Sequence, residues 1–182
     1  MAAVLVIDVQ REFFSPEGIM GQRYIKTQPL LSNIDILIQN SRSNNYPVYW
    51  IRSEYNCNVK SEYPSHTGKP CCVAESELSK FIPEIESLIE PQDKIITKHY
   101  YSAFMGTGLD QLIPHRRLLV VGVTANNCVK HTAKSAYDLG YDVTLIKNCI
   151  AGGTMSRVSD ILKEMDFAHV ISDIAEFSAI NL

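Results

Sequence analysis

The chain has 182 residues, of which 46% are hydrophobic and 20% are charged, and its formal net charge at pH 7 is −3. This length predicts a single domain over residues 1–182, large enough to bury a core without disulfide bonds or a structural metal. The ordinary globular composition excludes disordered, collagen-like and disulfide-scaffold proteins. Because no excess of basic residues is present to neutralise phosphates, we expect no nucleic-acid partner.

Residues 1–14 read MAAVLVIDVQREFF. The segment has no basic start, and Asp8 interrupts its apolar run, so it predicts a buried strand rather than a signal peptide or a membrane span. No other stretch approaches about 18 uncharged apolar residues, so we expect no membrane partner and a cytoplasmic location. The five cysteines are an odd number that cannot pair completely within the chain, and a reducing compartment leaves cysteines free. They are Cys57, Cys71, Cys72, Cys128 and Cys149.

Short apolar, β-branched runs alternate with longer segments of helical periodicity. The predicted strands are residues 3–9, 47–52, 94–98, 118–123, 142–146 and 168–172. The predicted helices are residues 28–44, 83–89, 127–139 and 156–165, the third ending before Gly140. Most strands are apolar on both faces, which is typical of a mainly parallel sheet with helices on both sides. The alternation therefore predicts an α/β fold.

Residues 53–76 show no clear periodicity. The segment contains Pro64, Gly68, Pro70 and three of the five cysteines. A long irregular segment within a compact domain is usually a functional lid or a contact surface, and we expect specificity-determining groups there.

Ligands in open α/β sheets bind beyond the carboxyl ends of the strands. Asp8 ends the first predicted strand, Lys98 ends the third, and Cys128 follows the fourth. A carboxylate, an ammonium and a thiol that converge on one crevice are candidate catalytic residues. Each also has an ordinary alternative: Asp8 could cap a turn or bind Mg²⁺, Lys98 could be solvated, and Cys128 could be a small buried hydrophobe.

Cys128 follows Asn126 and Asn127, either of which can cap the helix predicted from residue 127. The thiol would then lie in the first turn, where free N–H groups and the helix dipole favour an anion. With Lys98 nearby, this placement predicts a lowered pKa for Cys128. His131, three residues later, is interpreted as an ordinary helix residue.

Other kinds of site lack support in the sequence. There is no GxxxxGK[ST] phosphate loop and no GxSxG elbow, and Gln10 occupies the position where a haloacid-dehalogenase-type phosphatase needs a second Asp. The adjacent Cys71 and Cys72 and the dispersed histidines do not match zinc-ligand spacing, so we expect no metal site.

Three motifs resemble the isochorismatase-like cysteine hydrolases. They are VLVIDVQREFF around Asp8, TKHYYSAFMGTGLD around Lys98, and VVGVTANNCVKHTAKSAYDLGYDV around Cys128, in the family's order. The resemblance implies a Rossmann-like three-layer sandwich with a six-stranded sheet of order 3-2-1-4-5-6. It also implies a homo-oligomer, dimer or tetramer, that acts on a small molecule.

The resemblance assigns roles to the three residues. Cys128 would be the nucleophile, Asp8 the general acid and base, and Lys98 the cation that stabilises both. Val123–Thr124 matches the place of a non-proline cis peptide, which would direct the Thr124 N–H, with the Cys128 N–H, into an oxyanion hole. The thiolate would attack an amide carbonyl, and water would hydrolyse the resulting thioester, without any metal or organic cofactor.

Pocket-lining candidates follow from their positions beside the motifs, and core or loop packing is the alternative for each. They are Gln10, Phe13, Tyr100, Phe104 and Asn127. Trp50 could belong to the core or the pocket wall, and Arg52 could bind a substrate carboxylate, although an exposed salt bridge is favoured.

The chain departs from the nicotinamidases of the family. These carry a metal site built from Asp-x-His after the second strand plus a further His. Here the stretch reads Arg52-Ser53-Glu54-Tyr55-Asn56, with Glu54 and His66 as the remaining candidate ligands.

This departure disfavours nicotinamide as the substrate, whereas Cys128 favours an amide or carbamoyl compound. The alternatives are vinyl-ether hydrolysis of the isochorismatase type and a non-catalytic binding protein on the same fold.

Overall fold

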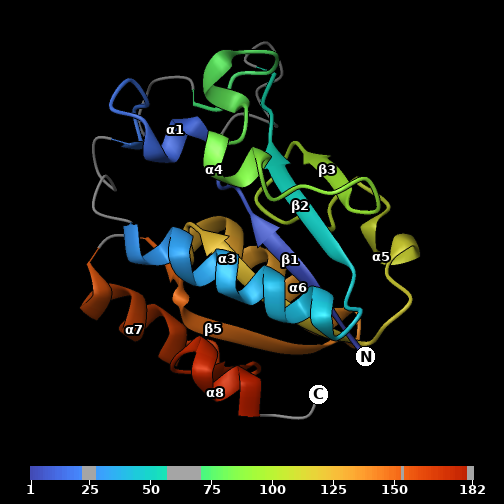
Figure 1. Cartoon of the computed structure of the whole chain (residues 1–182). Coiled ribbons are helices and arrows are strands. Elements are labelled where there is room, and N and C mark those ends of the chain that lie inside the picture. The colour runs from blue at the N-terminus through green and yellow to red at the C-terminus, as the bar shows by residue number, and fades with distance from the viewer. Residues whose placement is uncertain (22–27, 57–70, 153, 180–182) are drawn as a thin grey trace.

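Six parallel strands form one open sheet in the order β3-β2-β1-β4-β5-β6 (Figure 1). The structure, a computed structural model, describes residues 1–21, 28–56, 71–152 and 154–179. The strands are β1 (Ala2–Ile7), β2 (Val48–Ser53), β3 (Lys94–Lys98), β4 (Arg117–Val123), β5 (Asp142–Ala151) and β6 (His169–Ile171). All six predicted strands, the α/β class and the strand order implied by the family resemblance are confirmed. β5 continues to Ala151, past the predicted end at residue 146, so Cys149 lies inside this strand.

The central strand β1 is buried along its whole length. Val4 and Val6 pack into the core on one face of the sheet, whereas Leu5 and Ile7 pack into the core on the other. Side chains of a strand alternate between the two faces, so a strand covered on both sides must be apolar at every position. This is why the run before Asp8 contains no polar residue.

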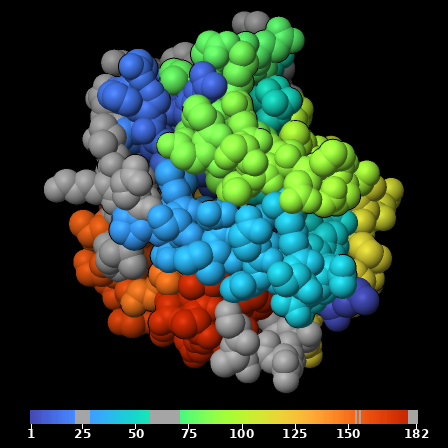
Figure 2. Space-filling model, in the orientation of Figure 1, coloured from blue at the N-terminus to red at the C-terminus, as the bar shows by residue number. Residues whose placement is uncertain are grey.

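Helices cover both faces of the sheet. α3 (Gln28–Ser43) and α8 (Ile174–Ala179) pack on one face, together with the short helices α1 (Arg11–Phe14) and α4 (Pro83–Glu86). α5 (Leu109–Leu112), α6 (Lys130–Asp138) and α7 (Met155–Lys163) pack on the other. In the space-filling view, α3 and the segment around α4 lie against each other over the first face (Figure 2). Within the described part of the chain, no helix has the length and apolarity needed to cross a membrane.

The helix predicted from residue 127 begins differently in the structure. A π-helical turn, η2 (Ala125–Val129), precedes α6, and its N-cap Thr124 makes no side-chain capping bond. The predicted capping by Asn126 or Asn127 is therefore wrong. The four-residue helices α1 and α5 and the short η1 (Glu77–Ser79) are too short to show a helical period, and the sequence did not predict them or α8.

Gly122 lets β4 approach β1 just before the strands end. It pairs with Ile7, and a Cβ built at this position would lie 2.1 Å from the Ile7 carbonyl oxygen. Its φ of 109° is also a conformation that side chains disfavour. Since Asp8 follows Ile7, and η2 begins two residues after Val123, this contact sets how closely the two chain segments lie at the carboxyl edge.

Replacing Gly122 by alanine should therefore destabilise the folded protein much more than the same change at Gly140. Gly140 also has a positive φ, 82°, but a Cβ there meets no atom within 4 Å. We expect Gly122→Ala to lower the free energy of unfolding by about 3 kcal/mol or more. Gly140→Ala should cost about 1–2 kcal/mol, the left-handed backbone penalty alone. Chemical denaturation measures both, and equal losses would contradict the role given to the Ile7 contact.

Candidate active site

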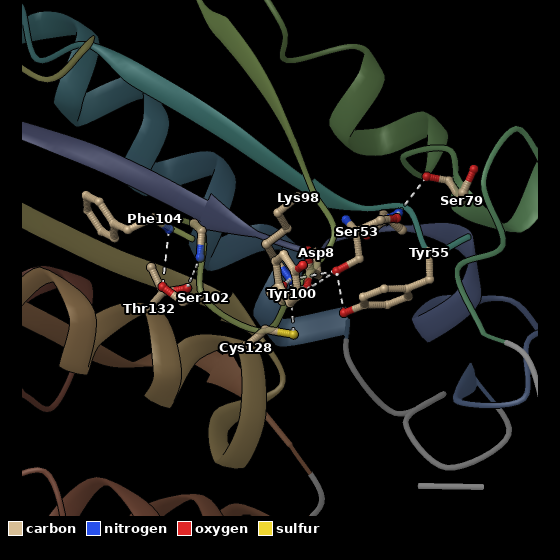
Figure 3. Close-up of polar contacts among 12 residues, drawn as sticks. Asp8, Ser53, Tyr55, Ser79, Lys98, Tyr100, Ser102, Phe104, Cys128 and Thr132 are labelled. Atoms are coloured by element: carbon tan, nitrogen blue, oxygen red, sulfur yellow. Dashed lines mark hydrogen bonds and ion pairs between the residues drawn. The ribbon is translucent and has the colours of Figure 1, made fainter. Parts of the chain in front are cut away.

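Four adjacent strands each bring one polar side chain to the carboxyl edge of the sheet. Figure 3 shows these side chains gathered in one place. Lys98 ends β3, Ser53 ends β2, Asp8 follows β1, and Cys128 lies in η2 after β4. Ser53 and Lys98 are paired in the register of β2 and β3. All four residues are buried. The sheet therefore assembles one buried polar cluster from segments far apart in the sequence.

Asp8 and Lys98 form an ion pair with no exposed surface on either side chain. Lys98 Nζ lies 2.9 Å from Asp8 Oδ2. Asp8 has a φ of 54°, in the left-handed region that aspartate tolerates better than most residues, and its N–H donates to the Ile51 carbonyl of β2 at 2.9 Å. A buried ion pair is stable only where further hydrogen bonds satisfy both partners.

The Lys98 ammonium reaches four acceptors. Besides Asp8 Oδ2, these are Ser53 Oγ at 2.6 Å, the Tyr100 carbonyl at 3.1 Å and Cys128 Sγ at 3.3 Å. An ammonium has three N–H groups, so at least one is shared, and the neutral thiol sulfur is the weakest acceptor. Burial alone would lower the pKa of Lys98, but the charges of Asp8 and of an ionised Cys128 outweigh burial and raise it above its usual range. Lys98 is therefore a permanent cation.

Cys128 is neutral in the free protein, contrary to the sequence-based expectation. Burial and the negative charge of Asp8 raise the pKa of the Cys128 thiol to about 12, although Lys98 acts in the opposite direction. The predicted lowering of this pKa is wrong because the thiol is buried beside a carboxylate. Chemistry at Cys128 therefore requires a base.

Asp8 has a carboxylate oxygen that can act as this base. Its Oδ2 accepts from Lys98 and, at 3.0 Å, from Ser53 Oγ. Its Oδ1 is buried and has no hydrogen-bond partner among the described residues. A buried carboxylate oxygen with unused acceptor capacity next to a neutral thiol can accept the proton of that thiol.

The segment that joins β4 to α6 carries the predicted oxyanion-binding groups. The Val123–Thr124 peptide bond is cis, and Thr124 and Cys128 are both buried. The Thr124 carbonyl accepts from the N–H groups of Asn127 and Val129, at 3.1 Å and 3.2 Å, and so closes the π-helical turn. The binding of an oxyanion by the Thr124 and Cys128 N–H groups stays a prediction.

Gln10 and Phe13 make structural contacts, and their contact with substrate stays a prediction. Both N–H groups of the Gln10 amide are used, since Nε2 donates to the carbonyls of Ser53 and Ser79, and Oε1 accepts from the Ser53 N–H. Gln10 thereby ties the end of β1 to the end of β2. Phe13 is buried in the hydrophobic core on the α3 face.

The loop after β3 contributes backbone to the site more clearly than side chains. Tyr100 gives its carbonyl to Lys98, and its side chain is partly exposed. The predicted pocket contact of Phe104 is not supported, because its ring packs against Tyr141, which precedes β5 at the opposite edge of the sheet. Asn127 is partly exposed next to Cys128, so its predicted contact with substrate stays a prediction.

Other residues noted in the sequence lie outside the cluster. Trp50 is a core residue whose Nε1 donates to Asp93, and Arg52 forms a salt bridge with Glu54. His131 stacks on Tyr101. Within the described residues the cysteines are free; Cys72 is buried and Cys71 partly exposed. Cys57, His66 and the rest of residues 57–70 lie outside the described residues.

Ser53 and Tyr55 belong to the cluster but were not predicted. Ser53 Oγ bonds to Asp8 and Lys98, and the Tyr55 hydroxyl lies 3.2 Å from Ser53 Oγ. The available signal was topological: in the order 3-2-1-4, the end of β2 must lie between the ends of β1 and β3. A serine at that position is not by itself a reactive residue type, so the sequence alone does not single it out.

The isochorismatase-domain family model matches residues 2–175. Nicotinamidase 3 of Arabidopsis thaliana is 29% identical over 151 residues, which cover 79% of this chain and 69% of that protein. The ureidoacrylate amidohydrolase RutB of Enterobacter sp. (strain 638) is 23% identical over 203 residues, covering 97% and 87%. An isochorismatase family protein of Desulfovibrio vulgaris has the same fold, with a TM-score of 0.84, 22% identity, and 98% and 97% of the chains covered.

The electrostatics of the cluster predict an unusual result for Asp8→Asn. This change removes the charge that raises the pKa of Cys128 and leaves Lys98⁺ without a carboxylate, so the thiolate becomes its counter-ion. Alkylation of Cys128 by iodoacetamide at neutral pH should become about tenfold faster. Mass spectrometry of the modified peptide measures the rate.

Cys149 is the internal control for that experiment. Burial alone raises the pKa of Cys149, also to about 12, so its alkylation should not respond to Asp8→Asn. In the wild type, alkylation of Cys128 should accelerate with rising pH, because the thiolate fraction grows until the pH reaches the pKa. An unchanged or slower reaction of Cys128 in the variant would show that Asp8 does not hold the thiol neutral.

Proposed function

The chain belongs to the isochorismatase family of hydrolases, and we propose that it is a metal-independent cysteine hydrolase that cleaves a C–N bond of a small amide or carbamoyl compound through a Cys128 thioester. One observation carries the proposal: the buried ammonium of Lys98 lies 2.9 Å from the Asp8 carboxylate and 3.3 Å from the Cys128 sulfur. A base, a cation and a nucleophile are thereby in contact, out of water.

The first half of the reaction makes the thiolate only when it is needed. Asp8 removes the proton of the neutral Cys128 thiol through Oδ1, and the thiolate attacks the substrate carbonyl. Lys98 stabilises the thiolate, which is a stronger hydrogen-bond acceptor than the thiol. The Thr124 and Cys128 N–H groups bind the oxyanion of the tetrahedral intermediate.

The rest of the reaction uses the proton that Asp8 has taken from Cys128. Asp8 returns it to the leaving nitrogen as the C–N bond breaks, which leaves a thioester on Cys128 and the carboxylate ionised again. Water then attacks the thioester carbonyl while Asp8 accepts one of its protons. Collapse of the second intermediate expels the thiolate, which regains the proton from Asp8, so the protein returns to its starting state.

The residues at the Asp-x-His positions of the nicotinamidase metal site do not suit a metal here. The Ser53 hydroxyl is occupied by Asp8 and Lys98, and Glu54 pairs with Arg52 at 3.4 Å. Burial, with added effects of Cys128 and Asp8, raises the pKa of Tyr55 far above its usual range, so its phenol stays neutral. Among the described residues, no three His, Cys, Asp or Glu side chains are placed to hold an ion.

The substrate class rests on the thiol and on the named relatives. A thioester forms naturally from an amide or carbamoyl carbonyl, and a vinyl ether offers no carbonyl for a thiolate to attack. Two of the similar proteins are a nicotinamidase and an amidohydrolase, which also points to C–N bond cleavage.

Ammonia release from a panel of small amides and ureido compounds tests the proposal. The wild type should release ammonia from at least one compound, and Cys128→Ala should lower kcat/KM by about 10³-fold or more. Cys149→Ala is the matched control, since it removes another buried thiol and should keep the activity. A thioester should be captured by hydroxylamine as the hydroxamate of the substrate acyl group.

Three outcomes would contradict the proposed reaction. Full turnover by Cys128→Ala removes the nucleophile from the mechanism. Product formation from a vinyl ether without release of ammonia or amine assigns the isochorismatase type of reaction. Absence of turnover across the panel, combined with tight binding of a macromolecular partner, assigns a binding role.

Chelation provides an independent test of metal independence. Because the side chains at and just after the end of β2 are a hydrogen-bonded serine, a salt-bridged glutamate and a neutral tyrosine, EDTA followed by gel filtration should leave kcat/KM unchanged. Added Zn²⁺ should not increase it. Loss of activity on chelation, with recovery on addition of Zn²⁺, would show that a metal takes part.

A further inference from the structure

Ser53 connects three members of the cluster, and the reaction described above does not use it. Its side chain is fully buried at the end of β2. Its Oγ lies 2.6 Å from Lys98 Nζ, 3.0 Å from Asp8 Oδ2 and 3.2 Å from the Tyr55 hydroxyl (Figure 3). Ser53 is therefore the point where the ion pair and the tyrosine meet.

The direction of each of these hydrogen bonds follows from the chemistry of the partners. A hydroxyl has one proton and two lone pairs, an ammonium can only donate, and a carboxylate can only accept. Ser53 must therefore donate to Asp8 and accept from Lys98. The second lone pair is left for Tyr55, whose neutral phenol donates to it. The hydrogen-bonding capacity of Ser53 is then filled, so its hydroxyl cannot rotate without loss of a bond.

This arrangement acts differently on the two oxygens of Asp8. Oδ2 receives hydrogen bonds from Ser53 and Lys98, whereas Oδ1 has no partner within the described part of the chain. Donors to a carboxylate favour its charged form. Ser53 also takes an N–H of Lys98 that could otherwise point at the Cys128 sulfur. Both effects keep the proton on the thiol and away from Asp8.

We propose that Ser53 is a positioning residue that sets which of Asp8 and Cys128 holds the proton in the free protein. Its hydroxyl, itself held by Tyr55, binds Asp8 Oδ2 so that Oδ1 stays open, and it takes an N–H of Lys98, so that the thiol stays protonated until substrate arrives. The catalytic meaning of this inference rests on the proposed function. The resting position of the proton is a property of the free protein and can be measured without a substrate.

Several other titratable groups among the described residues face Asp8 and Cys128. Lys98 comes from β3 and Tyr55 from the residues after β2. The charges of Asp8 and Glu12 also act on Cys71 and Cys72, whose thiols border the cluster from the segment before η1. Apart from the Tyr55 hydroxyl, which one variant removes, none of these groups is altered when Ser53 or Tyr55 is changed, so a change in the reactivity of Cys128 reports the missing hydroxyl.

The test measures alkylation of Cys128 by iodoacetamide as a function of pH in Ser53→Ala and Tyr55→Phe. Ser53→Ala removes a donor from Asp8 and frees an N–H of Lys98 for the sulfur, so both effects shift the proton towards Asp8. At neutral pH, Cys128 should react about tenfold faster than in the wild type. Tyr55→Phe leaves the bond between Ser53 and Asp8 in place but weakens it, so it should give a smaller increase.

Two further serine variants separate the hydroxyl from packing. Ser53→Thr keeps the hydroxyl and should restore the wild-type rate. Ser41→Ala is the matched control, because Ser41 is equally buried in α3 and its Oγ has no partner among the described residues. It should leave the reactivity of Cys128 unchanged.

Distinct outcomes overturn this inference and the proposed function. Superimposable alkylation profiles for the wild type and Ser53→Ala overturn the role of Ser53, whatever the amide panel shows. Equal acceleration in Ser53→Ala and Ser53→Thr assigns the effect to packing and also overturns it. If Ser53→Ala does not fold, the isosteric Tyr55→Phe decides, and an unchanged rate overturns the inference. An inactive amide panel with the expected alkylation shifts removes the proposed function and leaves the role of Ser53 intact.

Discussion

The Lys98 ammonium is a full positive charge with none of its side-chain surface in water, and the surrounding structure is arranged to accommodate it. A buried ammonium without partners would lose its proton, because its desolvation is far more costly than neutralisation. Asp8, Ser53, the Tyr100 carbonyl and Cys128 together replace the lost water. Each of these groups is therefore constrained twice, by its own chemistry and by the need to solvate Lys98.

The strand order explains how four distant segments meet that need. Neighbouring strands are about 4.8 Å apart, so β3 lies two spacings from β1, and a side chain from β3 must be long to reach Asp8. Lysine has that length, and Ser53 on the intervening β2 fills the space beneath it with a group that accepts from Lys98 and donates to Asp8. On the other side, Gly122 allows β4 to approach Ile7 closely, which brings η2 and Cys128 towards Asp8.

The strands were predictable from the sequence because each depends on local composition: a run such as residues 2–7 can only be buried on both faces. The convergence of Asp8, Lys98 and Cys128 followed from the rule that strand ends share one edge. The electrostatic state of Cys128 was not predictable, since it depends on burial and on the distance to Asp8, which only the packed structure provides. The role of Ser53 was not predictable for the same reason, because it depends on the three hydrogen-bond partners that only the packed structure shows.

The neutral state of Cys128 has a consequence for selectivity. A thiol activated by a helix terminus would be a thiolate at all times and would react with any electrophile that entered the site. In the proposed reaction, the carboxylate that raises the pKa of the thiol is also the base that removes its proton, so reactivity depends on a proton transfer from Cys128 to Asp8. We expect that transfer to be favoured by a substrate whose carbonyl reaches the Thr124 and Cys128 N–H groups, and not by a small oxidant or alkylating agent. In the proposed reaction, the buried ion pair thus links the reactivity of the thiol to the recognition of a carbonyl group.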